Sequence, residues 1–117
     1  MIEDKARELG RLIGQSAEYQ SVKSTSEALN GDKDAIGKLR RMEELRHEAH
    51  RMIERGESPS KDMESELDTL LGAVQANLTY QRAVSAQENF DKTMLRVNEW
   101  ILDGIKKGSE SRIITLG

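Results

Sequence analysis

The sequence predicts an all-α fold of about five helices, and three observations support this prediction. Charged residues make up 33% of the 117 residues, aromatic residues only 3%, and there is a single proline. Apolar residues recur at alternating steps of three and four along most of the chain, which places them on one face of a helix. Long solvated helices fit these features better than a β-sandwich or barrel, which needs more β-branched residues and turns.

The longest helical pattern predicts a helix over residues 78–107, around which the rest of the chain is organised. At about 1.5 Å per residue this helix is roughly 45 Å long, so it extends beyond the shorter helices. We expect a second copy of the chain to cover its far end. The candidate self-association residues are Phe90, Met94, Val97, Trp100 and Ile101, with Leu95 and Leu102 widening the stripe.

Two shorter helices are expected before residue 32. The first covers about residues 2–15 and has an apolar stripe that includes Ile2, Leu9 and Ile13. Ser16 is a good N-cap for the second helix, because its hydroxyl can accept a hydrogen bond from an amide of the next turn. The second helix is the least apolar of the five, so we expect it to depend on packing for its stability.

The next two helices form a predicted antiparallel hairpin over residues 33–55 and 59–76. Asp32 is the expected N-cap of the first and Gly56 its end, whereas Ser58 with Pro59, or Ser60 one step later, starts the second. Their short connection makes them antiparallel. The first helix is net basic and the second net acidic. This difference indicates weak mutual attraction or, alternatively, a surface for a partner.

The domain organisation follows from the length of the chain. We expect one helical domain over residues 1–108, because 117 residues suffice for one core but not for two. Gly108 is the expected end of the last helix. Residues 109–117 form a predicted tail, which is either flexible or docks onto the bundle or a neighbouring subunit.

Two segments of the chain resemble each other. Ser16-Ala-Glu-Tyr-Gln and Asn77-Leu-Thr-Tyr-Gln both consist of a helix cap followed by an aromatic residue. Further matches follow at the same offset, including Leu29 with Phe90. The similarity predicts two equivalent corners in the fold.

Composition excludes several classes of function. The formal net charge of -3 argues against general attraction to nucleic acid or to anionic membranes. The absence of cysteine excludes disulfides, thiol nucleophiles and cysteine-ligated metal centres within the chain. No apolar stretch has the length of a signal peptide core or a membrane span. We therefore expect a cytoplasmic protein without membrane insertion.

The best fragment of a metal site is Glu44-Leu-Arg-His47, which has the Glu-x-x-His spacing of di-iron helical bundles. Such a site needs a second motif of this kind, and His50 is the only other histidine. We therefore expect no metal, no cofactor and no catalytic residue, and a metal-dependent bundle enzyme is the alternative. His47 and His50 are expected to pair with Glu43 and Glu54.

Basic residues of the helix over 33–55 offer a second alternative, a nucleic-acid surface. Glutamates at positions 43, 44 and 48 interrupt them and would repel phosphates, so a solvated face is expected and direct nucleic-acid binding is not. The basic residues are Lys38, Arg40, Arg41, Arg46, Arg51 and Arg55.

The order of elements resembles the YlbF/YmcA family of small bacterial helical proteins. The resemblance covers about residues 2–107 and depends on the segments 16–19, 28–32 and 75–83, which read SAEY, ALNGD and QANLTYQRA. Two features depart from the family pattern. Leu78 stands where proline is usual, and the apolar residues after Gly108 are an addition.

This resemblance implies an all-α fold that self-associates and a regulatory role through protein contacts. Relatives act in competence, sporulation and biofilm control, or as accessory factors for messenger RNA cleavage. Some bind iron–sulfur clusters through cysteines, a property that is not carried over to this cysteine-free chain. We therefore expect a non-enzymatic regulator or adaptor that forms a homodimer or higher oligomer and contacts a different protein as well.

Overall fold

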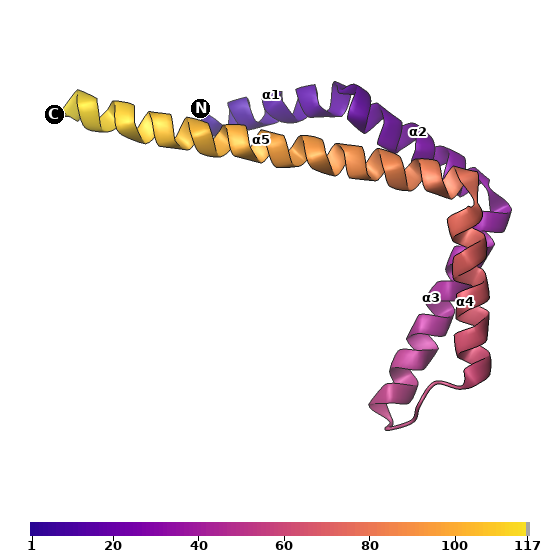
Figure 1. The fold of residues 1–117 in the computed structure, drawn as a ribbon. Helices are drawn as coiled ribbons and strands as arrows, with labels where there is room; N and C mark the ends of the chain where they lie inside the picture. The colour runs from indigo at the N-terminus through magenta and orange to yellow at the C-terminus, as the bar shows by residue number, and fades with distance from the viewer. Residues whose placement is uncertain (117) are drawn as a thin grey trace.

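The computed structural model describes the backbone of residues 1–116 and the side chains of residues 1–110. The described chain is helical and contains no strand, so the all-α prediction is confirmed. Its helices, shown in Figure 1, are α1 (Ile2–Gln15), α2 (Ala17–Gly31), α3 (Lys33–Glu54), α4 (Lys61–Ala76) and α5 (Leu78–Leu116).

The molecule is L-shaped (Figure 1). In one arm, α1 and α2 lie along α5, and in the other, α3 and α4 form the predicted hairpin. The hairpin contacts α5 only near the corner, and α2 is the main partner of α5. The radius of gyration is 21.9 Å, whereas a compact chain of this length has about 13 Å. A single chain is therefore far from globular.

Side-chain caps start the helices where the chain turns. Ser16 Oγ accepts a hydrogen bond from the Tyr19 amide over 3.2 Å, and Asp32 Oδ1 accepts one from the Ala35 amide over 3.1 Å. Ser60 rather than Ser58 caps α4, so the second helix of the hairpin begins at Lys61 instead of residue 59. The expected caps Ser16 and Asp32 are confirmed.

The hairpin turn begins at Gly56, as the sequence predicts. Gly56 has a φ of 77°, which L side chains rarely adopt. The Glu57 amide donates to the Met52 carbonyl over 2.8 Å, and the Gly56 amide donates to the Ile53 carbonyl over 3.0 Å. These two bonds form a Schellman motif and satisfy carbonyls that the end of α3 leaves free.

The two equivalent corners that the sequence predicts are confirmed in their hydrogen bonds. Asn77 Oδ1 accepts from the Tyr80 amide over 2.9 Å, as Ser16 does from Tyr19. Behind each cap, a glutamine side chain reaches back to a carbonyl of the preceding helix. Gln20 Nε2 donates to the Gly14 carbonyl over 2.8 Å, and Gln81 Nε2 to the Gln75 carbonyl over 2.7 Å.

The last helix continues beyond Lys107, where the sequence predicts its end. A terminating glycine adopts positive φ, but Gly108 does not, and α5 runs on to Leu116. An isolated glycine inside a helix costs only about 1 kcal/mol, which the neighbouring turns can offset. The expectation that residues 109–117 are flexible or dock stays a prediction, because the side chains of residues 111–117 lie outside the described part.

Candidate protein-contact surface

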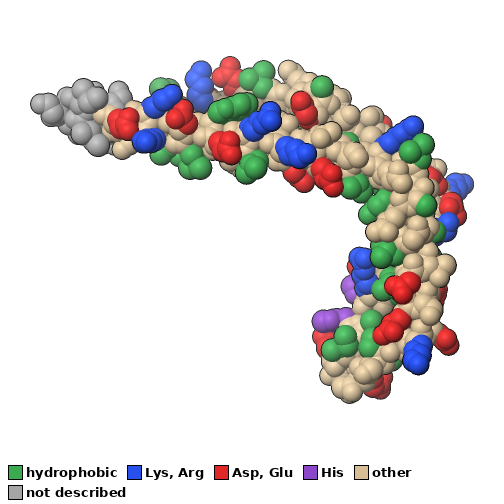
Figure 2. All heavy atoms as spheres, in the orientation of Figure 1, with side chains coloured by type: hydrophobic (Ala, Val, Ile, Leu, Met, Phe, Trp, Pro, Cys, Tyr) green, Lys and Arg blue, Asp and Glu red, His purple; other side chains and the backbone are tan. Residues whose placement is uncertain are grey.

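Exposed apolar side chains gather at the far end of the long arm. Four of them on α5, Leu95, Trp100, Leu102 and Ile105, are 61–66% exposed. Figure 2 shows such side chains along this arm, interspersed with acidic and basic ones. We define the arm-end surface by the exposed apolar residues that surround this part of the arm, which are Ile2 and Leu12 of α1 and Leu95, Trp100, Ile101, Leu102 and Ile105 of α5. On α5, Leu95, Leu102 and Ile105 share one face, whereas Trp100 lies on nearly the opposite face from Leu102.

The amphipathic sequence of α1 explains its share of this surface. Ile2, Ala6, Leu9 and Ile13 lie on one face of α1, yet none of its residues is buried. A groove of about 460 Å³ runs between this face and α5, and its lining is almost wholly apolar. The lining residues are Met1, Ile2, Lys5, Ala6, Leu9 and Ile101.

The structure divides the five predicted self-association residues into two groups. Val97 is only 6% exposed, and the Phe90 ring packs edge-on against Tyr19, with 5.4 Å between the ring centroids. Met94 is half-buried. These three contribute to the packing of the chain itself, whereas Trp100 and Ile101 remain exposed. A role of all five in self-association stays a prediction.

Part of this surface has only a weak signal in the sequence. The main pattern of α5 places Leu95 and Leu102 at the margin of its stripe, and the pattern of α1 places Ile2 on its apolar stripe without indicating that it is exposed. The signal that identifies them is a second stripe on α5, since Leu95, Leu102 and Ile105 are separated by helical steps of seven and three. The exposure of Ile2 has no sequence signal, because it depends on what lies opposite α1.

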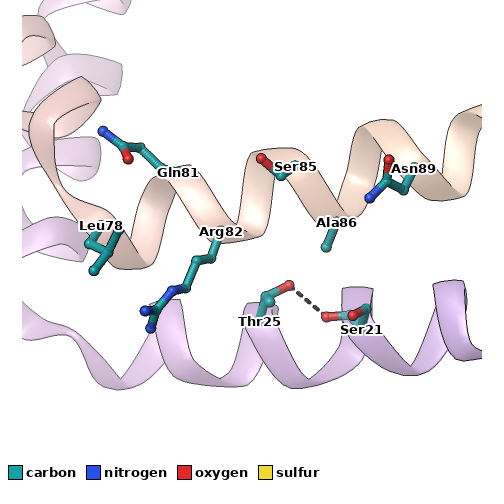
Figure 3. Close-up of a pocket in the computed structure, with 8 residues that line it drawn as sticks. All are labelled: Ser21, Thr25, Leu78, Gln81, Arg82, Ser85, Ala86 and Asn89. Carbon is teal, nitrogen blue, oxygen red and sulfur yellow. Dashed lines mark hydrogen bonds between the residues drawn. The ribbon is translucent and has the colours of Figure 1, made fainter.

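A second, polar groove lies between α2 and α5 (Figure 3). Its volume is about 400 Å³, and Arg82 reaches across it from α5 toward α2. Thr25 Oγ1 donates a hydrogen bond to the Ser21 carbonyl over 2.7 Å, so the proton of this hydroxyl is engaged within α2. Arg82 is the only ionisable lining residue, so the groove holds no acid–base pair. Its lining consists of Ser21, Thr25, Leu78, Gln81, Arg82, Ser85, Ala86 and Asn89.

The histidines on α3 pair as the sequence predicts. His47 Nε2 lies 3.1 Å from Glu43 Oε1, and His50 Nε2 lies 3.0 Å from Glu54 Oε1, on exposed side chains. Glu44, the other member of the candidate metal fragment, instead contacts Arg41 Nη1 at 3.2 Å. Within the described part of the chain, no three histidine or carboxylate side chains form a group that could hold a metal ion.

Charged side chains of the hairpin form a contact between α3 and α4. Arg41 donates two hydrogen bonds to the carboxylate of Glu66, from Nε over 2.7 Å and from Nη2 over 3.1 Å. These bonds raise the pKa of Arg41 and lower the pKa of Glu66. The expected attraction between the basic α3 and the acidic α4 therefore has a specific contact.

Among the described helices, none combines the length and apolar character that a membrane span requires.

The sequence model of the family described as "Control of competence regulator ComK, YlbF/YmcA" matches residues 2–106. This match confirms the resemblance that the order of elements indicated.

Two similar proteins come from Limosilactobacillus reuteri, one from strain DSM 20016 and one from subsp. reuteri strain JCM 1112. Both are named UPF0342 protein. Each is 24% identical to this chain over 105 residues, which cover 90% of this chain and 85% of the relative. The similarity thus extends over nearly the whole arrangement of helices.

Proposed function

This chain belongs to the YlbF/YmcA family, and on that premise we propose that it is a non-enzymatic regulator that acts as an adaptor through helix-mediated protein contacts. The description of the family as a control of a competence regulator supports the regulatory role. The adaptor mechanism is supported by the shape of the chain and by the arm-end surface.

The observation that carries the mechanism is the surface that a single chain leaves exposed. The accessible area is 9253 Å² for a mass of 13.2 kDa, whereas a compact monomer of this mass exposes about 6,400 Å². The excess is about 2,800 Å², and a standard protein interface buries roughly 800 Å² on each partner. The chain therefore has enough excess surface for self-association and for contact with a different protein.

The arm-end surface is the part of this excess best suited to self-association. Isolated apolar side chains on a surface are ordinary, but Leu95, Leu102 and Ile105 are all exposed on one face of α5, and such a stripe between polar residues is typical of a protein interface. The rim carries charges of both signs, such as the ion pair of Lys107 Nζ with Asp103 Oδ2 at 3.0 Å. Mixed charges do not favour a phosphate backbone, so the rim supports a protein partner.

A complementation experiment tests the regulatory proposal. The gene is deleted in its host, and either the wild type or Leu102→Asp is returned at matched protein levels. We expect the wild type to restore the transcript profile and Leu102→Asp, which places a charge in the arm-end surface, to fail. Transcript levels that do not change on deletion would contradict a regulatory role, and full rescue by Leu102→Asp would contradict the arm-end mechanism.

A further inference from the structure

Each of the two equivalent corners carries a groove just after its helix cap, and the two grooves have matching linings. The first-corner groove has a volume of about 250 Å³ and is lined by Gln20, Lys23, Ser24 and Glu27. The second-corner groove has a volume of about 470 Å³ and is lined by Gln75, Tyr80, Gln81, Val84, Ser85 and Glu88. At one constant offset along the sequence, the glutamine, serine and glutamate of the first groove align with Gln81, Ser85 and Glu88 of the second.

The second-corner groove lies where the end of α4 meets the side of α5 that faces away from α2. Gln75 belongs to the last turn of α4, and the other lining residues belong to the first turns of α5. Figure 3 shows Gln81 and Ser85 pointing away from α2, whereas Arg82 points toward it. The groove therefore opens on a different side of α5 from the polar groove beside α2, and it lies before the arm-end surface along the helix.

Oxygen acceptors dominate the polar part of the second-corner groove. Gln81 Nε2 donates a hydrogen bond to the Gln75 carbonyl over 2.7 Å, which orients the amide and leaves its Oε1 as an acceptor. The Ser85 hydroxyl can accept as well, and the Glu88 carboxylate can only accept. A lining of this kind fits a hydrogen-bond donor that carries a positive charge.

Glu88 supplies the negative charge of this groove. It forms no ion pair with any residue whose side chain the structure describes. Lys92 stands four positions further along α5, but an exposed pair at this spacing is weak. The formal net charge of -3 also makes the chain attractive to cations. The carboxylate is therefore available to a cationic group from another molecule.

We propose that the second-corner groove binds an arginine side chain of a partner protein, with its guanidinium on the Glu88 carboxylate and against the Tyr80 ring. The inference rests on the proposed adaptor function, and it supplies a contact for a different protein. A planar guanidinium can pair with a carboxylate through two hydrogen bonds and stack on an aromatic ring, which an ammonium group cannot do in the same way. Tyr80 and Val84 are half-buried and give the methylene stem of arginine an apolar wall.

The first-corner groove lacks two of these features, although its backbone is equivalent. Lys23 stands where the second groove has Val84, so a cation of the chain itself already lies beside Glu27. Tyr19, the counterpart of Tyr80, packs edge-on against Phe90 with 5.4 Å between the ring centroids and does not line the groove. We therefore expect no arginine binding at the first corner, which makes it a matched control within the same chain.

A titration followed by nuclear magnetic resonance tests the site with a defined probe. N-acetyl-arginine-N-methylamide is added to the ¹⁵N-labelled chain up to about 50 mM, and the lysine analogue is added in a parallel series. We expect the arginine probe to cause saturable shifts of the Gln81 side-chain amide and of the backbone amides around Tyr80 and Glu88. The lysine analogue should bind at least about threefold more weakly, because it lacks the planar donor pair.

Two variants that remove the same charge assign the binding to one corner. Glu88→Gln should weaken the arginine probe by about fivefold or more, since it removes the charge from the contact. Glu27→Gln makes the same change at the first corner and should leave the binding unchanged. Equal weakening by both variants would show attraction to the net charge alone, and equal binding of arginine and lysine would contradict the arginine assignment. Absence of saturable shifts would overturn the site.

Complementation then tests whether a partner uses the groove. In the deletion host, we expect Glu27→Gln to restore the transcript profile like the wild type and Glu88→Gln to fail. Full rescue by Glu88→Gln would contradict a partner contact at this groove and leave the regulatory role and the arm-end mechanism standing. Transcript levels that do not change on deletion would overturn the regulatory role, whereas the titration would still decide whether the groove binds arginine.

Discussion

Asn77 Nδ2 donates a hydrogen bond to Asp32 Oδ2 over 3.1 Å, and this bond joins the start of α5 to the start of α3. Each residue also caps its own helix, since Asp32 accepts from the Ala35 amide and Asn77 accepts from the Tyr80 amide. The two arms of the molecule are therefore connected at their corner by the same side chains that begin their helices.

Removing the Asn77 side chain should weaken both the cap and the corner. We expect Asn77→Ala to lower the free energy of unfolding by about 1–2 kcal/mol. Ser60→Ala is the control, because Ser60 caps α4 without a bond to another helix, and it should cost about 1 kcal/mol or less. Urea denaturation of both variants measures the difference. Equal losses would contradict a role of Asn77 beyond capping.

The corner also gives the stability a dependence on pH. The hydrogen bonds from the Ala35 amide and from Asn77 lower the pKa of Asp32 from its ordinary value of 3.8. Because the pKa is lower in the folded chain, the ionised carboxylate stabilises the fold above pH 3.8, and this stabilisation is lost as the pH falls through the folded pKa.

Asp32→Asn tests this dependence, since asparagine can still cap α3 but does not titrate. We expect the difference in melting temperature between the wild type and Asp32→Asn to be constant near neutral pH and to shrink below about pH 4. Thermal unfolding at a series of pH values measures it. A difference that stays the same down to pH 2.5 would show that Asp32 has an unshifted pKa.

The two glycines that the sequence predicts as helix ends should respond oppositely to alanine. Gly56 has a φ of 77°, so Gly56→Ala should destabilise the fold by about 1–2 kcal/mol. Gly108 lies inside α5 with open space around its Cα, so Gly108→Ala should increase helix content and stabilise it by roughly 0.5–1 kcal/mol. Circular dichroism and thermal unfolding measure both. Destabilisation by Gly108→Ala would indicate that α5 ends there.

The hairpin has its own small core, which should dominate its stability. Leu45 is only 2% exposed on α3, so Leu45→Ala should cost about 2–5 kcal/mol. Leu71→Ala on α4 removes the same atoms from a side chain that is 37% exposed, and should cost clearly less. Chemical denaturation compares the two. Similar losses would mean that Leu71 is covered in solution, for example by a partner.

Local features of this fold could be predicted from the sequence because their physical causes are local. The caps at Ser16, Asp32 and Asn77 are recognisable because each is a polar residue just before a segment whose apolar residues recur at helical spacing. The hairpin follows from Gly56 and a short connection. The repeated corner at Tyr19 and Tyr80 follows from a matching pattern of residues.

The arrangement of the arms could not be predicted, because it depends on contacts between distant parts of the chain. The bond between Asp32 and Asn77 joins residues 45 positions apart, and no helical period predicts it. Val97 and Trp100 lie near each other on α5, yet one is buried and the other exposed. That difference depends on where α1 and α2 lie, which the sequence pattern alone does not determine.

Sedimentation equilibrium of the wild type over roughly 1 to 100 µM tests the central claim of self-association most directly. We predict a concentration-dependent rise from one chain of 13.2 kDa to twice that mass, with Leu102→Asp staying near the mass of one chain and Ile53→Asp following the wild type. A wild-type mass of 13.2 kDa throughout this range would contradict the claim.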